Sequence, residues 1–264
     1  MKIPFAKYNG TGNDFIIIDN RILNWAPFEK EIAFLCHRHF GIGADGLMLL
    51  SAKAGFDFAM TYFNSDGLES TMCGNGGRCI TAFARSLGLI DGATHFYAID
   101  GEHKAVVLSA TNQEFLIRLK MKDTIIGKVL DDGIFIDTGS PHFVTMLKNV
   151  NELDVFHQGK TLRNDSRFAP GGSNINFLEV NPERLFVRTY ERGVEDETLS
   201  CGTGVTASAL VTAFLNQDNP GFYQVSTRGG ILKVTFKQNV NSFRDIWLEG
   251  PVAFVFSGEI ELNF

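Results

Sequence analysis

The chain has 264 residues, a formal net charge of −6 and 44% hydrophobic residues, which is the composition of a globular protein with a sizeable core. Its acidic balance argues against nucleic acid as a partner. Its four cysteines, Cys36, Cys73, Cys79 and Cys201, are too few in a chain of this length for a disulfide scaffold. It begins without the apolar core of a signal peptide, and its least polar stretch, 203–215, is too short for a bilayer span of about 20 residues. We therefore expect a soluble, cytoplasmic protein.

The first part of the chain alternates short apolar runs with glycine-rich turns. Residues 5–7 and 15–19 read as strands on either side of the loop Tyr8-Asn9-Gly10-Thr11-Gly12-Asn13-Asp14. This loop is either a tight turn or a phosphate cradle, although it lacks the Lys-Ser/Thr pair of a P-loop. Hydrophobic spacing predicts a helix at 28–39 and strands at 47–51 and 56–63.

The histidines and the minor cysteines do not form a metal-site pattern. His37 and His39 are two positions apart on the expected helix, so their side chains point in different directions. Cys36 and Cys79 are expected to pack inward as small hydrophobic side chains. A single Cys73–Cys79 pair without further convergent ligands is weak evidence for zinc. We expect no metal site.

Two cysteine turns dominate the pattern, Cys73-Gly74-Asn75-Gly76-Gly77 and Cys201-Gly202-Thr203-Gly204. Each turn leads into an apolar run that predicts a helix, and the run 205–215 carries no charge, so we expect that helix to be buried on every side. A thiol at a helix N-terminus lies close to free backbone N–H groups and the positive end of the helix dipole. Such a setting lowers a cysteine pKa from about 8.5 towards neutrality and makes the thiolate a usable base.

The two turns belong to longer segments that resemble each other. Residues 69–76 align with 197–204, and strand-like segments follow at 94–122 and 221–256. The cysteines are 128 positions apart (201 − 73), close to half the chain. This pattern predicts a duplication into two similar domains that share a cleft. We expect domains at 1–122 and 123–264, with a last strand at about 257–264 packing on the first domain.

The second half carries further candidate polar residues. A crossover is expected at 122–132, followed by a strand at 134–137 that runs into the turn before His142. A strand at 173–180 carries Asn174, and a strand at 185–190 delivers Glu191 and Arg192 to the second cysteine turn. Gly250-Pro251 is expected to separate the final strands, 246–248 and 252–256.

Four interpretations of the cysteine pair compete. A redox pair favours Cys-x-x-Cys spacing, a zinc site needs two more ligands, and buried structural cysteines need no adjacent glycines. The fourth interpretation is proton transfer at a carbon acid, in which one thiolate removes an α-proton and one thiol returns a proton to the opposite face. Helix N-termini would also hold the substrate carboxylate and stabilise the enolate-like transition state. This fourth interpretation accounts for most of the features.

The sequence resembles the cofactor-independent diaminopimelate epimerases. The resemblance covers nearly the whole chain and is specific because the motifs occur in this order and spacing. The motifs are Gly10-Thr11-Gly12-Asn13-Asp14-Phe15, Phe63-Asn64-Ser65-Asp66-Gly67, Met72-Cys73-Gly74-Asn75-Gly76, Pro141-His142, Tyr190-Glu191-Arg192-Gly193 and Cys201-Gly202-Thr203-Gly204.

The resemblance implies interconversion of LL- and meso-diaminopimelate in lysine and peptidoglycan precursor biosynthesis, without pyridoxal phosphate, metal or other cofactor. It implies an α+β fold of two similar, pseudo-symmetric domains, each a mixed β-barrel-like sheet around a central helix, and it suggests a homodimer. It implies catalytic thiols at Cys73 and Cys201, with His142 and Glu191 assisting proton transfer. Gly74, Asn75, Gly202 and Thr203 would bind the reacting carboxylate, and Asn13, Asn64, Asn174 and Arg192 the distal amino acid centre.

Two positions depart from the family pattern. Many members carry Gln where this chain has Gly46, and Asn where it has Ser140, so the contacts to the distal centre are expected to be thinner or water-filled. The nearest enzymatic alternative is a racemase of another amino acid such as proline or hydroxyproline. The asparagine set with Arg192 favours a substrate with a second polar centre instead. A non-catalytic amino acid binding module is the alternative of another class.

Overall fold

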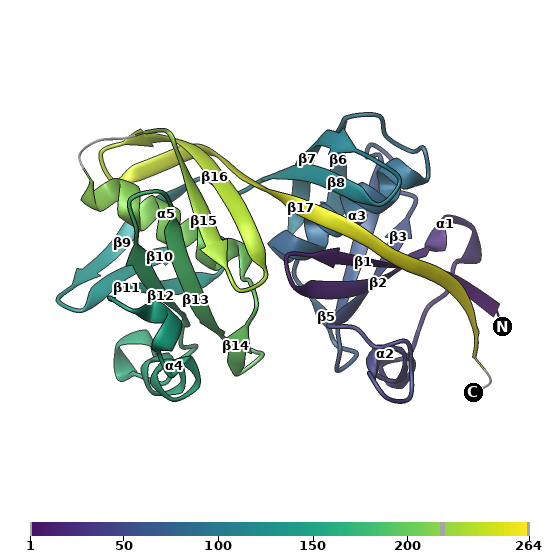
Figure 1. Cartoon of the computed structure of the whole chain (residues 1–264). Helices are drawn as coiled ribbons and strands as arrows, with labels where there is room; N and C mark the ends of the chain where they lie inside the picture. The colour runs from purple at the N-terminus through teal and green to yellow at the C-terminus, as the bar shows by residue number, and fades with distance from the viewer. Residues whose placement is uncertain (1, 217–219, 263–264) are drawn as a thin grey trace. The chain divides into compact units, whose positions relative to one another are not determined.

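Figure 1 shows the computed structural model of the chain, which describes residues 2–216 and 220–262. The chain forms two compact units, Met1–Leu119 with Gly250–Phe264, and Lys120–Glu249. Strand β17 (Ser242–Glu261) belongs to both units, and its part in the first unit starts at Gly250, earlier than the position near 257 expected from the sequence. The expected break at Gly250-Pro251 is wrong. Pro251 continues the strand opposite Leu116, because the fixed φ of proline is compatible with an extended backbone.

The first unit is built from strands around one long helix. Its elements in chain order are β1 (Lys2–Gly10), β2 (Asn13–Asp19), α1 (Asn20–Leu23), α2 (Glu29–Cys36), β3 (Gly46–Ser51), β4 (Phe58–Asn64), β5 (Glu69–Ser70), α3 (Gly74–Ser86), β6 (Ala93–Ala98), β7 (Gly101–Ala110) and β8 (Glu114–Lys120). Within the described residues, the ladders close in the order β1-β2-β3-β4-β6-β7-β8-β17-β1. Closure leaves no exposed sheet edge in this ring.

Helix α3 lies against strands from across that ring. It contacts β1, β2, β3 and β7, and residues 74–84 are all buried. The ladders β2–β3 and β4–β6 are parallel and the others antiparallel, so the sheet is mixed. A second core, on the α2 side, contains Ile32, Leu35 and Cys36. The inward packing predicted for Cys36 and Cys79 is confirmed, since both are buried.

The second unit repeats this connectivity. Its elements are β9 (Thr124–Leu130), β10 (Gly133–Asp137), β11 (Pro141–Met146), η1 (Val150–Glu152), α4 (Val155–Arg163), η2 (Ser166–Phe168), β12 (Asn174–Val180), β13 (Leu185–Glu191), β14 (Asp196–Thr198), α5 (Gly202–Leu215), β15 (Phe222–Thr227), β16 (Gly230–Asn239) and the start of β17. In the described part of the chain the ladders close as β9-β10-β11-β12-β13-β15-β16-β17-β9. Both units therefore have a mixed eight-strand ring with an extra short strand, β5 or β14, just before the long helix.

Helix α5 is buried almost all round, as its lack of charge predicted. It contacts six strands of its ring, and nearly every residue from Gly202 to Ala213 is buried. The crossover expected at 122–132 is wrong, because this segment contains strand β9, which pairs with β10 and β17. Helix α4 was not predicted. Only Val155 and Gly159 of that helix are buried, which leaves a weak apolar pattern.

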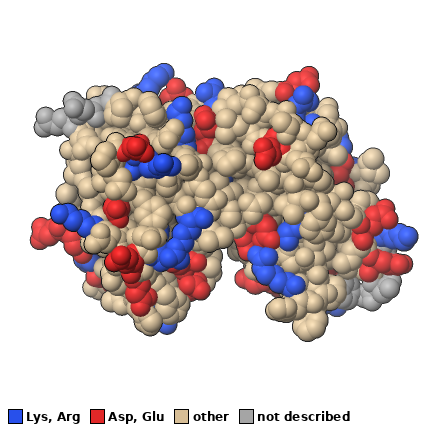
Figure 2. Space-filling model, in the orientation of Figure 1, with Lys and Arg blue, Asp and Glu red and all other residues tan. Residues whose placement is uncertain are grey.

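Charged side chains of both signs are interspersed on the face of each unit that Figure 2 shows. This distribution agrees with the modest net charge of −6. Over residues 2–216 and 220–262, none of the helices combines the length and apolar character that crossing a membrane requires.

Candidate active site

Cys73 is the N-cap residue of α3. Its backbone is extended, with φ −95° and ψ 144°, and its Sγ accepts a hydrogen bond of 3.2 Å from the backbone N–H of Gly76. The sulfur thus takes the place of the oxygen that usually caps a helix. The side chain is half-buried, and the helix begins where the sequence predicted.

The tip of the β1–β2 hairpin packs against this first turn of α3. Thr11 and Gly12 form a two-residue turn with φ values of 57° and 99°, which is the type I′ geometry of tight hairpins. A methyl group at Gly10 would lie 2.9 Å from Cys79 Sγ and 3.0 Å from the Asn75 carbonyl oxygen. Glycine at position 10 therefore permits the close approach of hairpin and helix.

Two side-chain amides meet where the hairpin and the helix touch. Asn75 Nδ2 donates to Asn13 Oδ1 at 2.5 Å, and Asn13 Nδ2 donates to Asp45 Oδ2 at 3.0 Å. On the other side, Asn75 Oδ1 accepts from Arg78 Nη2 at 3.0 Å. Because carboxylates only accept and guanidinium groups only donate, these partners fix the orientation of both amides.

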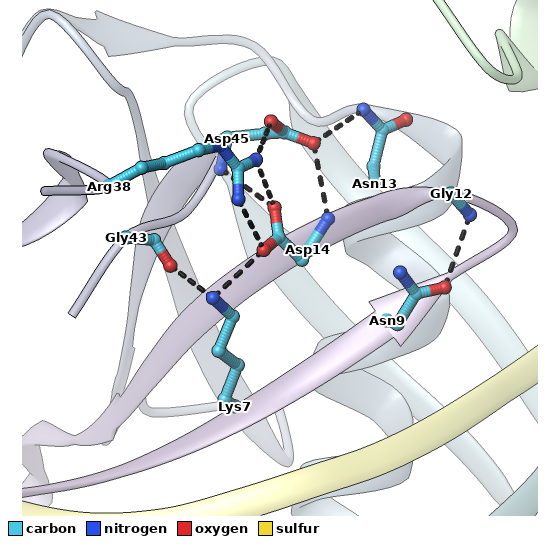
Figure 3. A network of polar contacts seen from close by, with 8 residues as sticks. All are labelled: Lys7, Asn9, Gly12, Asn13, Asp14, Arg38, Gly43 and Asp45. Carbon is cyan, nitrogen blue, oxygen red and sulfur yellow. Dashed lines mark hydrogen bonds and ion pairs between the residues drawn. The ribbon is translucent and has the colours of Figure 1, made fainter.

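The carboxylate that holds Asn13 belongs to a charged network, shown in Figure 3. Arg38 donates to Asp14 and to Asp45, at 2.7 and 2.6 Å, and Lys7 Nζ lies 2.8 Å from Asp14 Oδ2. Burial of Asp14 opposes its ionisation, but the hydrogen bonds from Arg38 and Lys7 outweigh burial and lower its pKa to about 2. Asp14 is therefore ionised at neutral pH, and the network holds the Asn13 end of the hairpin in place.

Cys201 is the N-cap residue of α5. Its Sγ lies 3.4 Å from Thr203 Oγ1, and Thr138 Oγ1 donates to the Thr203 carbonyl oxygen at 2.9 Å. Its side chain is buried, whereas that of Cys73 is half-buried. Gly204 lies against Asn176, and a methyl group there would meet Asn176 Oδ1 at 2.2 Å.

His142 is held by that same asparagine. Asn176 Nδ2 contacts His142 Nδ1 at 3.1 Å and donates to the Phe143 carbonyl oxygen at 3.2 Å, while Asn176 Oδ1 accepts from Thr189 at 3.0 Å. A carbonyl oxygen can only accept, so the amide NH₂ faces His142 and Nδ1 must act as acceptor. The proton of neutral His142 therefore sits on Nε2, which is buried and has no partner among the described residues.

Burial lowers the pKa of His142 to about 3, against a smaller opposing effect of the Asn176 hydrogen bond. The imidazole is therefore neutral at physiological pH and can donate from Nε2. Its folded-state pKa lies below the unfolded value of about 6.5, so the unfolded chain binds more protons between these values and stability falls as pH falls through that window.

We expect His142→Gln to remove this dependence. Each pH unit inside the window costs the wild-type chain about 1.4 kcal/mol of unfolding free energy through this group. Urea unfolding of both chains between pH 6.5 and 4.5 measures the difference in slope. His157→Gln, at an exposed histidine beside Asp154, is the matched control for the loss of an imidazole at the surface. Equal slopes for wild type and His142→Gln would contradict the buried neutral imidazole.

Asn174 bridges the turn before His142 and the backbone of Arg192. Its Nδ2 donates to Ser140 Oγ and to the Pro141 carbonyl oxygen, both at 2.9 Å, and its Oδ1 accepts from the Arg192 backbone N–H at 2.8 Å. Glu191 ends β13, and its Oε2 accepts from Thr198 at 2.9 Å. Arg192 is exposed. Within the second unit the structure therefore brings Asn174 and Arg192 together.

The sequence matches a known protein family over most of its length. The family model for diaminopimelate epimerase matches residues 5–122 and 134–255. The diaminopimelate epimerase of Flavobacterium psychrophilum is 47% identical over 259 residues, covering 96% of this chain and 98% of the relative. The chain belongs to the diaminopimelate epimerase family. It is an isomerase.

Solved structures with lower identity share the fold. A PhzF-family phenazine biosynthesis protein of Bacillus anthracis has a TM-score of 0.77 at 15% identity, covering 99% of this chain and 100% of that one. A probable proline racemase of Agrobacterium radiobacter has a TM-score of 0.76 at 13% identity, covering 99% and 93%. The mixed fold of strand rings and helices is thus a fold that these proteins share with the epimerase family.

The two departures from the epimerase pattern have local explanations. Any side chain at position 46 would start 2.6 Å from the ring of Tyr62 and 2.5 Å from the Phe63 carbonyl oxygen, so Tyr62 occupies the space that a glutamine would need. Ser140 still offers an oxygen, which accepts from Asn174. Asn64 lies opposite Gly46 at the end of β4.

Sequence reasoning missed several residues that support the family motifs. The sequence by itself assigns no role to Arg78, Asp45, Asn176 or Thr189. The local signal for Arg78 was a charged residue inside an apolar helical run after Cys73. Asp45 and Thr189 carry no such signal, because their roles depend on contacts made through the fold.

Proposed function

We propose that this chain interconverts LL- and meso-diaminopimelate, with Cys73 and Cys201 as the acid–base pair. One thiolate takes the proton as the Cα–H bond breaks, and the other thiol delivers its proton to the opposite face of the resulting carbanion. No electrons are gained or lost, so the reaction needs no redox partner. The observation that carries the proposal is that both cysteines occupy the same place, the N-cap of a long buried helix, in two units of equal connectivity.

The helix N-termini would stabilise the negative charge of the reaction. Backbone N–H groups at Gly74, Asn75, Gly202 and Thr203 lie in the first turns of α3 and α5, where free donors and the helix dipole favour an anion. We propose that they hold the α-carboxylate, on which charge develops as the proton leaves. The glycines in these turns allow close approach of the backbone.

The polar side chains would divide between the reacting and the distal centre of the substrate. Asn13, Asn64, Asn174 and Arg192 would bind the distal amino acid centre, Arg192 through a charge-assisted contact with its carboxylate. His142, neutral with its proton on Nε2, would assist as a hydrogen-bond donor. Glu191 would assist as a carboxylate beside the second cysteine turn.

The repeated connectivity supports an origin by duplication, with two pseudo-symmetric domains that correspond to the two compact units. We further propose a homodimer, following the family resemblance, and a role in lysine and peptidoglycan precursor biosynthesis without a cofactor. A thiol pair must stay reduced to exchange protons, which favours the cytoplasm as the site of action. The four cysteines are free thiols in the structure.

Proton NMR of LL-diaminopimelate in deuterated water tests the proposal, with no cofactor added and L-proline as a parallel substrate. We expect loss of one α-proton signal and formation of the meso isomer. Exchange in proline alone would move the chain to the racemase alternative while keeping thiol chemistry. Exchange in neither substrate would overturn the proposal and favour a binding module.

A further inference from the structure

Arg78 is a fully buried cation on α3, five positions after Cys73. Its guanidinium group donates to the Gly74 carbonyl oxygen at 3.2 Å, to Thr11 Oγ1 at 2.8 Å and to Asn75 Oδ1 at 3.0 Å. All three acceptors are neutral, and Nε is buried without a partner. Among the described residues, no carboxylate lies within ion-pairing distance of this side chain.

Arg188, the other buried arginine among the described residues, is neutralised by a carboxylate. Arg188 Nε and Nη2 each donate to a carboxylate oxygen of Glu197 at 2.7 Å. Removing a charge from water without such a partner is costly, so an uncompensated buried cation is rare. Arg78 is therefore placed to stabilise a negative charge that forms at the first cysteine turn.

The matching position of the second unit carries an uncharged residue. The position five residues after Cys201 is Thr206, whose hydroxyl donates to the Gly202 carbonyl oxygen at 2.9 Å. In α3, the carbonyl oxygen of Gly74, which corresponds to Gly202, accepts a hydrogen bond from Arg78 instead. His142 pairs with Asn174 in the parallel ladder of the second unit. In the matching ladder of the first unit, Phe15 pairs with Gly46, so Phe15 takes the place of His142. The first turn thus has a buried cation, and the second a buried neutral imidazole.

The charge of Arg78 persists at neutral pH. Burial lowers its pKa to about 10, while negative charge on Cys79 and Cys73 would raise it. Cys79 is itself buried and its pKa is raised, so it stays a neutral thiol. From the hairpin, Tyr8 has a raised pKa and is neutral, and Asp14 is already paired with Lys7 and Arg38. On the β7 side, Asp100 accepts from the Met72 backbone N–H at 3.4 Å and is paired with His103 at 3.1 Å. Cys73 is the group whose ionisation the Arg78 charge would favour.

We propose that Arg78 is a positioning residue that stabilises the thiolate of Cys73 and holds the Asn75 amide at the proposed carboxylate site. The inference rests on the proposed function, which makes Cys73 an acid–base group. The Arg78 guanidinium donates to both Thr11 and Asn75, so it also links the hairpin tip to the helix. Lysine could supply the positive charge but not the planar set of N–H donors.

Alkylation of each cysteine by iodoacetamide, followed over pH by peptide mass spectrometry, tests the charge directly. The thiolate attacks the methylene carbon and iodide leaves, so the pH midpoint reports thiolate formation without turnover. For Arg78→Gln we expect the Cys73 midpoint to rise by about one unit, and for Arg78→Lys to stay near wild type. Cys201 in the same molecules is the internal control and should not move. An unchanged Cys73 midpoint in Arg78→Gln would overturn the inference.

Steady-state kinetics of Arg78→Lys tests whether Arg78 positions Asn75, separately from its charge. Arg78→Lys should raise KM several-fold because Asn75 Oδ1 loses the hydrogen bond from the Arg78 guanidinium. A purely structural role would leave both KM and the Cys73 midpoint of the folded variants unchanged. Epimerisation by the wild-type chain is measured beside it, so a failure of the proposed function is seen separately from a failure of this inference.

A wild-type measurement covers the case in which Arg78→Gln does not fold. The anionic reagent iodoacetate and the neutral iodoacetamide are compared at both cysteines. A buried cation near Cys73 should give a higher iodoacetate-to-iodoacetamide rate ratio there than at Cys201, whose helix has Thr206 at the position that matches Arg78. Equal ratios at the two cysteines would overturn the inference.

Discussion

Replacing either Cys73 or Cys201 by serine should lower epimerase turnover by at least about 10³-fold, within the range that a positioned acid or base contributes. A serine hydroxyl is far too weak an acid to be ionised at neutral pH, so it can neither take nor exchange the α-proton. Serine is also a preferred N-cap residue, so the bond from Gly76 N–H to position 73 can be kept and the fold preserved. Solvent deuterium exchange into LL-diaminopimelate, read by NMR, measures the loss.

Cys36→Ala is the matched control in the same chain. Cys36 is buried in the core beside α2, and burial raises its pKa to about 12, so it carries no usable thiolate. We expect a small loss of stability and wild-type turnover. Turnover near wild type in Cys73→Ser or Cys201→Ser would rule out the two-thiol mechanism.

The largest effect on stability is expected from Arg188→Met. Besides its bidentate contact with Glu197, Arg188 donates to the carbonyl oxygens of Val150, Asn151 and Leu153. The substitution leaves a half-buried carboxylate and several carbonyl groups without this donor. Breaking a buried pair on one side costs about 3–5 kcal/mol. Urea unfolding at neutral pH should show this loss.

Arg85→Ala is the control, because it removes an arginine from an ion pair at the surface. Arg85 Nη1 lies 3.4 Å from Asp91, whose side chain is fully exposed, and such pairs contribute about 0–1 kcal/mol. A loss of similar size in Arg85→Ala and Arg188→Met would contradict the assignment of Arg188 as the anchor of the β13–β14 hairpin. That hairpin leads into the second cysteine turn, so its anchoring links stability to the site.

The two cysteine turns have the same backbone setting and different surroundings. Phe15, Met48 and Thr206 stand where the other unit has His142, Asn176 and Arg78. A duplicated fold can diverge in this way because the cysteine keeps its N-cap position in both units, while side chains on the neighbouring strands and on the helix differ. The two thiols are therefore expected to respond differently to pH and to charged reagents.

Local patterns in the sequence determined a large part of this protein. The glycine-rich cysteine turns and the apolar runs after them predicted where α3 and α5 begin, because helix caps and hydrophobic periodicity act over a few residues. The motifs in their order predicted the epimerase family, which the comparisons confirmed. The repeat 128 positions apart (201 − 73) pointed to two like units.

Only the tertiary structure decided which residues support those motifs. Strand β17 runs without a break into the first unit, where it pairs with β1 and β8. Both partners are remote from it in sequence, so a local pattern could not predict this pairing. The His142 tautomer depends on a chain of contacts through Asn176 and Thr189 from three strands. Asn13, Asn75 and Arg78 meet because Gly10 lets a hairpin tip reach the helix. Hydrogen bonding and burial of this kind depend on distances between remote segments, and a local pattern carries no information about those distances.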